Sequence, residues 1–203
     1  MRTIVTLLVL LLAAPGRADC PPAGEGGDPA LNQLKNRGDQ PAHPAPMEVA
    51  RILALRGAGP REPRARWTAA QRQAIAATEG AGVVAVGYLL GAKEEGPEAA
   101  NCHGEDHDEH DFHIWLAAAP DDPKSRAVVV EITPRQHDRR WTLAALHWLA
   151  RQHVQVRVTG WLMFDQEHGP DVGRSRGTLW EIHPITGIEE LRGGRWQAIG
   201  GGS

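Results

Sequence analysis

The sequence lacks several features that would assign a function directly. Its 203 residues include one Tyr, two Phe and only two Cys. There is no Gly-rich phosphate loop, no Cys-x-x-Cys pair and no paired-histidine helix motif. The formal charge is −3 at pH 7 and no block of Lys or Arg stands out. The chain therefore lacks the positive surface that non-specific nucleic-acid binding requires.

A long apolar run occurs only at the N-terminus. Arg2 is followed by a mainly apolar stretch over 4–14, then by a Pro-Gly break and small residues at the −3 and −1 positions before a cleavage point after Ala18. The run of about 11 residues is short of the roughly 20 that span a bilayer. It predicts a signal peptide over 1–18 and a soluble, secreted or periplasmic product; a retained membrane anchor is the alternative. Removal of Arg2 and Arg17 leaves 20 basic and 25 acidic side chains, a net charge of −5.

Composition divides the mature chain into segments. Residues 19–46 are rich in Pro, Gly and Asp, which predicts an extended arm on the surface. Residues 47–80 are expected to form a helical lead-in, with a capping box of Thr68 and Gln71 at the start of its second helix. Residues 193–203 are expected to form a flexible Gly-rich tail.

The region 81–192 has the periodicity of a mainly β domain with one longer helix. Strands are predicted at 82–90, 112–117, 127–132, 154–164 and 178–188. A helix capped by Asp138 is predicted over 139–152. This order, β-β-β-α-β-β, favours a five-stranded OB-like Greek-key barrel, with Gly87 and Gly160 at its bends. Pro184 predicts an edge or a bend in the last strand. An open α+β sheet is the alternative.

Short motifs mark the same region. They are Gly87-Tyr88-Leu89, Asn101-Cys102 and the segments 111–116, 130–135, 159–163 and 177–184. Together they resemble an uncharacterised family of secreted bacterial proteins with an OB-like barrel, and the likeness runs from Leu31 to about Glu190. The resemblance implies export and the element order. It implies no catalytic role, because no activity is assigned to that family.

The densest group of functional side chains lies in the predicted first hairpin loop. Four imidazoles, from His103, His107, His110 and His113, stand among five carboxylates and one thiol. Imidazole and carboxylate are ligands of divalent transition metals such as zinc, so the loop is a candidate metal site. Adventitious weak binding and a merely solvated acidic loop are the alternatives, since the spacing matches no fixed zinc motif.

A disulfide between the two cysteines would compete with metal binding by the Cys102 thiol. Cys20 and Cys102 are expected to form a disulfide, because an exported chain meets an oxidising environment. This bond would attach the arm to the first loop and withdraw Cys102 from any metal. A free thiol that binds metal and an intermolecular bridge remain as alternatives.

Three polar residues interrupt otherwise apolar strands. His113, Glu131 and His183 could converge on one barrel surface and act as a general base with an orienting carboxylate, or as metal ligands. Alternatively, each side chain points separately into solvent, as alternation along a half-buried strand normally implies.

Tryptophan is the abundant aromatic residue, with seven copies. Trp115, Trp161 and Trp180 lie in predicted strands where an OB-like barrel presents its ligand face, and they could stack on a small-molecule or carbohydrate-like ligand. Packing in the core is the alternative, and it is the role expected for Trp141 and Trp148 of the helix.

These observations favour an exported OB-like binding module that responds to metal through its His/acid-rich loop. A metal-assisted hydrolase that uses the loop histidines with His113, Glu131 and His183 is the alternative. The sequence identifies neither the ligand nor the metal.

Overall fold

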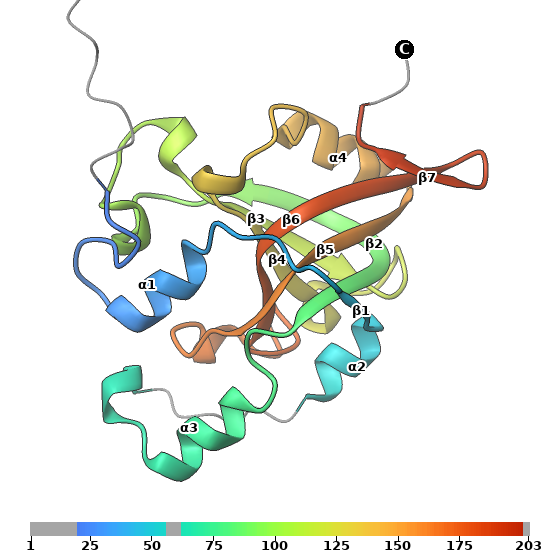
Figure 1. The fold of residues 1–203 in the computed structure, drawn as a ribbon. Coiled ribbons are helices and arrows are strands. Elements are labelled where there is room, and N and C mark those ends of the chain that lie inside the picture. The colour runs from blue at the N-terminus through green and yellow to red at the C-terminus, as the bar shows by residue number, and fades with distance from the viewer. Residues whose placement is uncertain (1–19, 56–61, 201–203) are drawn as a thin grey trace, which may run out of the picture.

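The structure is a computed structural model that describes residues 20–55 and 62–200. Its centre is a closed five-stranded barrel (Figure 1). The strands are β2 (Gly82–Glu94), β3 (Phe112–Ala117), β4 (Val128–Ile132), β5 (Gln155–Phe164) and β6 (Trp180–Arg192). Around the barrel they run β2-β3-β4-β6-β5 and back to β2; β4 and β6 are parallel, and the other pairs are antiparallel. This arrangement confirms the OB-like barrel and excludes the open sheet.

Two glycines let the strands approach where the barrel closes. β2 pairs with β5 through its first half and with β3 through its second half. A Cβ atom at Gly87, near this change of partner, would lie 2.4 Å from the Ala117 carbonyl oxygen. A Cβ atom at Gly160 would lie 2.5 Å from the Pro184 carbonyl oxygen, at a shift of register between β5 and β6. Pro184 therefore marks an irregular point in a strand that is not an edge strand.

The helix between β4 and β5 is shorter than the sequence predicts. Helix α4 runs over Leu143–Arg151 and packs on β2. The Thr142 hydroxyl accepts a hydrogen bond from the Ala145 amide and caps the helix, so the prediction of Asp138 as the cap was wrong. Trp141 is buried as expected. Trp148 is 41% exposed, because it lies on the side of α4 opposite the buried Leu146 and Leu149.

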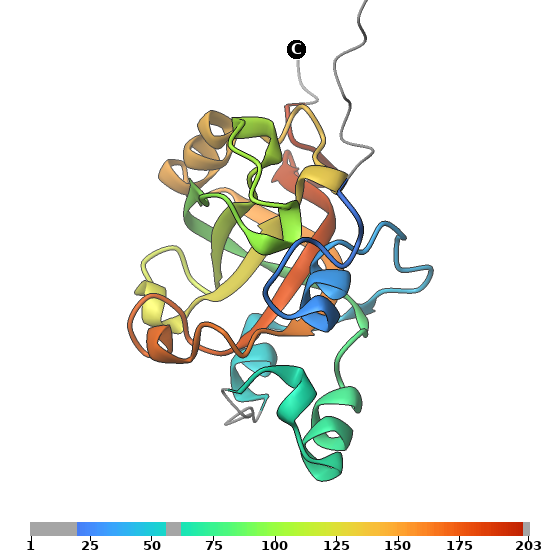
Figure 2. The ribbon, with the colours of Figure 1, turned by 90° about the vertical axis from the view of Figure 1, so that its left-hand side faces the viewer.

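The arm is not simply extended. Helix α1 (Pro29–Lys35) begins at Asp28, whose carboxylate accepts hydrogen bonds from the backbone of the first turn, and Leu31 is fully buried. Figure 2 shows α1 lying against the barrel. A short strand β1 (Ala45–Pro46) then runs parallel to β2.

Two further helices follow in the lead-in. They are α2 (Val49–Ala54) and α3 (Ala69–Ala76). The capping box of Thr68 and Gln71 is present at α3, as the sequence predicts. Among the described helices, none is both long and apolar enough to cross a membrane. The expected signal peptide, 1–18, lies outside the described residues.

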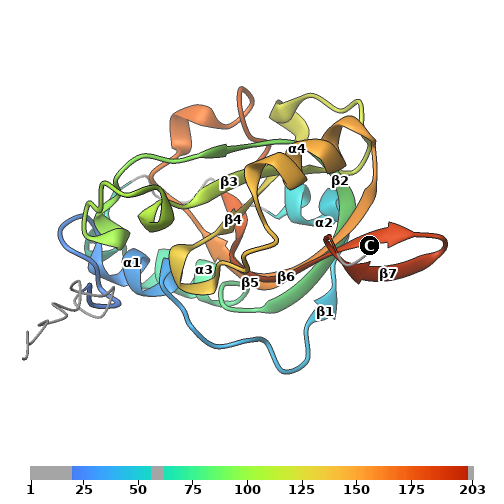
Figure 3. The same cartoon turned by 90° about the horizontal axis from the view of Figure 1, so that it is seen from above.

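The expected flexible tail is largely ordered. Strand β7 (Arg195–Ala198) forms a hairpin with the end of β6, which projects from the barrel in Figure 3, and Ile199 is buried in the core. The turn between the two strands needs Gly193 and Gly194, both of which have positive φ. Glycine is common both in flexible tails and in tight turns, and here Gly193 and Gly194 form the turn of a hairpin.

One part of the barrel is covered on its outer side as well. The strands β3 and β4 are buried at every residue, so both of their faces are shielded from water. The outer cover comes from α1, the β2–β3 loop (95–111) and the β5–β6 loop (165–179). The polar side chains of the outer face are therefore enclosed.

Candidate metal-binding sites

A row of buried polar side chains lies on the outer face of β3, β4 and β6. Its members, called the polar row below, are Asp111, His113, Glu131, Glu181 and His183. Their outward direction follows from the alternation of side chains along a strand. On β3, Phe112 and Ile114 enter the core, and His113 between them points outward. His113 stands opposite Glu131 in the β3–β4 register. Every member is at most 6% exposed.

Glu131 joins the two histidines of the polar row. Its Oε1 atom lies 2.9 Å from His113 Nδ1, and its Oε2 atom lies 3.1 Å from His183 Nδ1. The structure therefore brings together the three residues that the sequence placed on one surface. The alternative, that each points into water, is wrong, because α1 and the two loops cover this face.

Other carboxylates complete the surroundings of the two imidazoles. Glu95 Oε1 lies 2.9 Å from His113 Nδ1. Asp111 Oδ2 lies 3.5 Å from His183 Nε2, and Glu181 Oε2 lies 3.5 Å from His183 Nδ1. These contacts are close, yet among the described residues neither ring nitrogen of His113 or His183 has a hydrogen-bond partner with suitable geometry.

The enclosure perturbs the ionisation of the row. Burial lowers the pKa of His183, but the charges of Glu131 and Asp111 outweigh it and raise that pKa to about 10. Burial acts to raise the pKa of Glu131, yet the neighbouring His183 and His113 hold it well below its usual range. Burial raises the pKa of Asp111 to about 7. In this arrangement the imidazole of His183 carries a proton between carboxylates.

Charged residues of the β5–β6 loop extend the row, and the sequence did not single them out. Arg176 pairs with Glu181, and Asp165 Oδ2 lies 2.5 Å from His168 Nδ1. Residues 173–177 read Gly-x-Ser-x-Gly, but they form a turn that leads into β6 and no helix follows, so they are not a nucleophile elbow. The sequence feature that could have indicated these residues is the high density of charged residues just before the last predicted strand.

A second group lies in the β2–β3 loop. The Nδ1 atoms of His107 and His110 both lie 2.7 Å from Glu94 Oε1, and His110 Nε2 lies 3.0 Å from the Gly104 carbonyl oxygen. The hydrogen bonds with His107 and His110 lower the pKa of Glu94, and the bond with Glu94 raises the pKa of His110. Glu94, at the end of β2, was missing from the expected ligand set.

The four loop histidines do not form one site. His103 Nε2 lies 3.0 Å from the Glu25 carbonyl oxygen, and His113 belongs to the polar row. The reason is the direction of the chain: His113 is already in β3 and points away from the loop. The expectation of a four-histidine site was therefore wrong.

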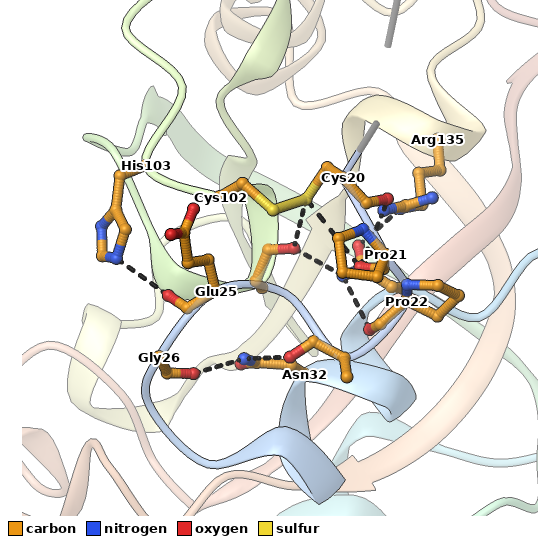
Figure 4. Close-up of a disulfide and its surroundings, with 12 residues drawn as sticks. Cys20, Pro21, Pro22, Glu25, Gly26, Asn32, Cys102, His103 and Arg135 are labelled. Atoms are coloured by element: carbon orange, nitrogen blue, oxygen red, sulfur yellow. Dashed lines mark hydrogen bonds between the residues drawn. A yellow bond between two sulfur atoms is a disulfide. The ribbon is translucent and has the colours of Figure 1, made fainter. Parts of the chain in front are cut away.

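The disulfide between Cys20 and Cys102 is present, as expected (Figure 4). It attaches the start of the arm to the β2–β3 loop and withdraws the Cys102 sulfur from metal binding. Arg135 strengthens the same attachment, because it donates hydrogen bonds to the Asn36 side chain and to the Cys20 carbonyl oxygen.

The three strand tryptophans do not make an open ligand face. Trp180 is in the barrel core against Phe164, and Trp115 is buried with the Lys124 ammonium 3.2 Å from its ring centroid. Trp161 is half-buried, and the Arg37 guanidinium covers it at 3.3 Å. A carbohydrate-like ligand therefore finds no stacking platform on these three rings.

Comparison with known proteins finds no matching family model, no similar curated protein and no similar solved structure. The roles of the two groups must therefore be argued from their geometry.

Proposed function

We propose that this protein is an exported OB-like binding module whose β2–β3 loop binds a divalent transition metal such as zinc. The ligands would be Glu94, His107 and His110. The observation that carries this proposal is that two imidazole nitrogens lie 2.7 Å from the same carboxylate oxygen.

The chemistry of this loop site suits zinc. Zinc takes imidazole nitrogen and carboxylate oxygen, and three protein ligands leave a fourth position open to water or another ligand. Metal-binding histidines usually donate their second N–H to a carbonyl or carboxylate, which fixes the ring orientation. The contact between His110 Nε2 and the Gly104 carbonyl is of this type. The His107 side chain is 94% exposed, so an ion would exchange readily with solvent.

Export is part of the same proposal. A disulfide is consistent with an oxidising compartment, and the N-terminal charge and apolar run have the form of a signal peptide. With a net charge of −5 after cleavage, non-specific binding to nucleic acid is not expected.

Calorimetry with Zn²⁺ on tag-free protein tests the loop site. We expect a dissociation constant in the micromolar range or tighter at pH 7.5, and weaker binding at pH 5.5, because protons compete for imidazole with an ordinary pKa near 6.5. The double substitution His107→Ala/His110→Ala should weaken binding at least tenfold, and Glu94→Gln should weaken it too. His103→Ala is the matched control from the same loop and should bind as the wild type does. Unchanged affinity in the double variant would refute the site.

A metal-assisted hydrolase is the second candidate, and the convergence of His113, Glu131 and His183 favours it. Their enclosure weighs against it, because a substrate must reach a catalytic group. A cavity of about 260 Å³ opens beside the row, lined by Lys35, Glu98 and His168 among others, but none of the three residues lines it. Turnover of ester or phosphodiester substrates that Glu131→Gln abolishes would favour the hydrolase over the binding module.

A further inference from the structure

We infer that Asp111, Glu131 and His183 form a second, buried site for a divalent transition metal, which is filled during folding and closed by α1. This site is independent of the loop site above. It uses different residues, and its ion would exchange on a different timescale.

The three ligands converge from separate elements. Asp111 ends the β2–β3 loop, Glu131 lies on β4 and His183 lies on β6, and one ligand atom of each lies within 4.8 Å of the others. Four ligands arranged tetrahedrally at about 2.0–2.2 Å from zinc lie about 3.3–3.6 Å from one another. The 3.1 Å contact between His183 Nδ1 and Glu131 Oε2 is close to that spacing. The 3.5 Å contact of Asp111 Oδ2 is with the other ring nitrogen, Nε2, so a single ion would use only one of these two contacts as a ligand spacing.

The imidazole of His183 is the observation that points to a ligand. It is fully buried and lies 3.1–3.5 Å from three carboxylates, yet among the described residues neither of its nitrogens makes a hydrogen bond of suitable geometry. Buried polar groups without partners are rare, because each forfeits its hydration without replacement. An ion at the centre of the three ligands would satisfy one imidazole nitrogen and two carboxylates together.

The local charges match one dication. Arg176 neutralises Glu181, and Lys35, with its Nζ 3.0 Å from Glu98 Oε2, neutralises that carboxylate. His113 lies 2.9 Å from Glu95 and from Glu131, and it is counted here as the partner of Glu95. Asp111 and Glu131 then remain as two negative charges around His183. A divalent cation with a neutral imidazole balances them, which a buried site requires.

Neighbouring groups orient the ligands. Asn101 Nδ2 donates a hydrogen bond to Asp111 Oδ1 at 2.9 Å, which leaves Oδ2 directed at His183. The other oxygen of Glu131 faces His113. Such outer contacts are typical of metal sites, where they hold the ligand atoms in place. One imidazole with two carboxylates suits zinc, manganese or cobalt.

The cover of the site predicts slow exchange. Helix α1 contributes the buried Lys35 to the surroundings of Asp111 and Glu131. The disulfide and Arg135 hold the start of the arm close to the β2–β3 loop (Figure 4). An ion could leave only when this cover opens, whereas the exposed loop site would release its ion quickly.

Elemental analysis after refolding tests the inference. The His107→Ala/His110→Ala protein, which lacks the loop site, is refolded in an equimolar mixture of Zn²⁺, Mn²⁺ and Co²⁺ and then treated with EDTA. We expect about one ion per chain to survive EDTA and to be released when guanidinium unfolds the protein. No EDTA-resistant ion would overturn the inference, and this readout changes no buried ligand.

Variants of the ligands give the second test. In the same background, His183→Gln and Glu131→Gln should lose the EDTA-resistant ion, while His153→Gln, an exposed control, should retain it. Retention by His183→Gln would overturn the assignment. Failure of the loop-site proposal would be seen separately, as the absence of EDTA-labile zinc in the wild-type protein.

Discussion

Arg176 and Glu181 form an ion pair in which neither side chain is more than 1% exposed. The pair joins the β5–β6 loop to β6, and Arg176 Nη1 also lies 3.7 Å from Asp165 Oδ2. One guanidinium thus faces two buried carboxylates. The position of the loop over the polar row depends on this charge balance, since two unpaired carboxylates could not remain buried.

Substitution of the arginine should therefore be costly. Arg176→Met removes the close cation of Glu181 and leaves Asp165 with His168 alone. Removal of one partner of a buried pair typically costs about 3–5 kcal/mol. We expect the free energy of unfolding in urea to fall by roughly that amount. Arg174→Met, an exposed arginine of the same loop, should change it by about 0.5 kcal/mol or less. Equal effects of the two variants would show that the buried pair has no special role.

The disulfide should stabilise the folded protein because it closes a long loop of the chain. Cys20 and Cys102 are 82 residues apart, and the chain-entropy model gives an upper figure of about 4.5 kcal/mol for a loop of this size. We expect Cys20→Ser/Cys102→Ser to lower the free energy of unfolding by about 2–4 kcal/mol. Urea titrations of the variant and of the reduced wild type should agree. Two free thiols in the unreduced, denatured wild type would contradict the bond.

The barrel was predictable because its signals are local. Alternation in β5 and the apolar runs of β3 and β4 identify strands, and glycines at positions 87 and 160 stand where strands approach closely. Helix α1 was missed because its seven residues sit in a Pro/Gly-rich segment, and its stability comes from burial of Leu31 against distant parts of the chain. Burial of that kind has no local pattern.

The sites were predictable only in part for a similar reason. His107 and His110 are neighbours in sequence, so their proximity followed from the loop, whereas Glu94 joins them from another element. The convergence of His113 and Glu131 follows from strand alternation and register. Their burial does not, because it depends on how α1 and two loops fold over the outer face. Trp148 illustrates the same limit, since a helix residue faces the core or water according to the angle at which the helix packs.

The ion pair of His168 and Asp165 should make stability depend on pH. The hydrogen bond to Asp165 raises the pKa of His168 to about 9 in spite of partial burial. Protonated His168 therefore contributes to the free energy of unfolding. This contribution is fully present below the unfolded-state pKa near 6.5 and is lost as the pH rises through about 9. The pKa of Asp165 is lowered despite its burial, so its contribution is present above pH of about 4 and is lost in acid.

Urea titrations from pH 4 to 9.5 measure this effect. The difference in unfolding free energy between the wild type and His168→Gln should be greatest between pH 4 and 6.5 and should decline toward pH 9. His43→Gln, which replaces an exposed histidine, should follow the wild type throughout. A difference that is constant across the range would mean that Asp165 does not raise the pKa of His168 in the folded protein.

The barrel should lose stability when Gly160, where β5 and β6 approach closely, gains a side chain. A Cβ atom at Gly160 would lie 2.5 Å from the Pro184 carbonyl oxygen and 2.8 Å from Ile185 Cα, both backbone atoms that cannot rotate away. Overpacking of this kind typically costs about 1–3 kcal/mol.

Gly187→Ala is the matched control on the paired strand, because its Cβ would meet Thr159 Cβ at an ordinary 3.6 Å. We expect Gly160→Ala to lower the free energy of unfolding by at least about 2 kcal/mol. Gly187→Ala should leave it unchanged or raise it by about 0.5 kcal/mol through the unfolded state. Equal stability of the two alanine variants in urea would show that β5 and β6 can separate at Gly160 without loss, and that the close approach there does not hold the barrel closed.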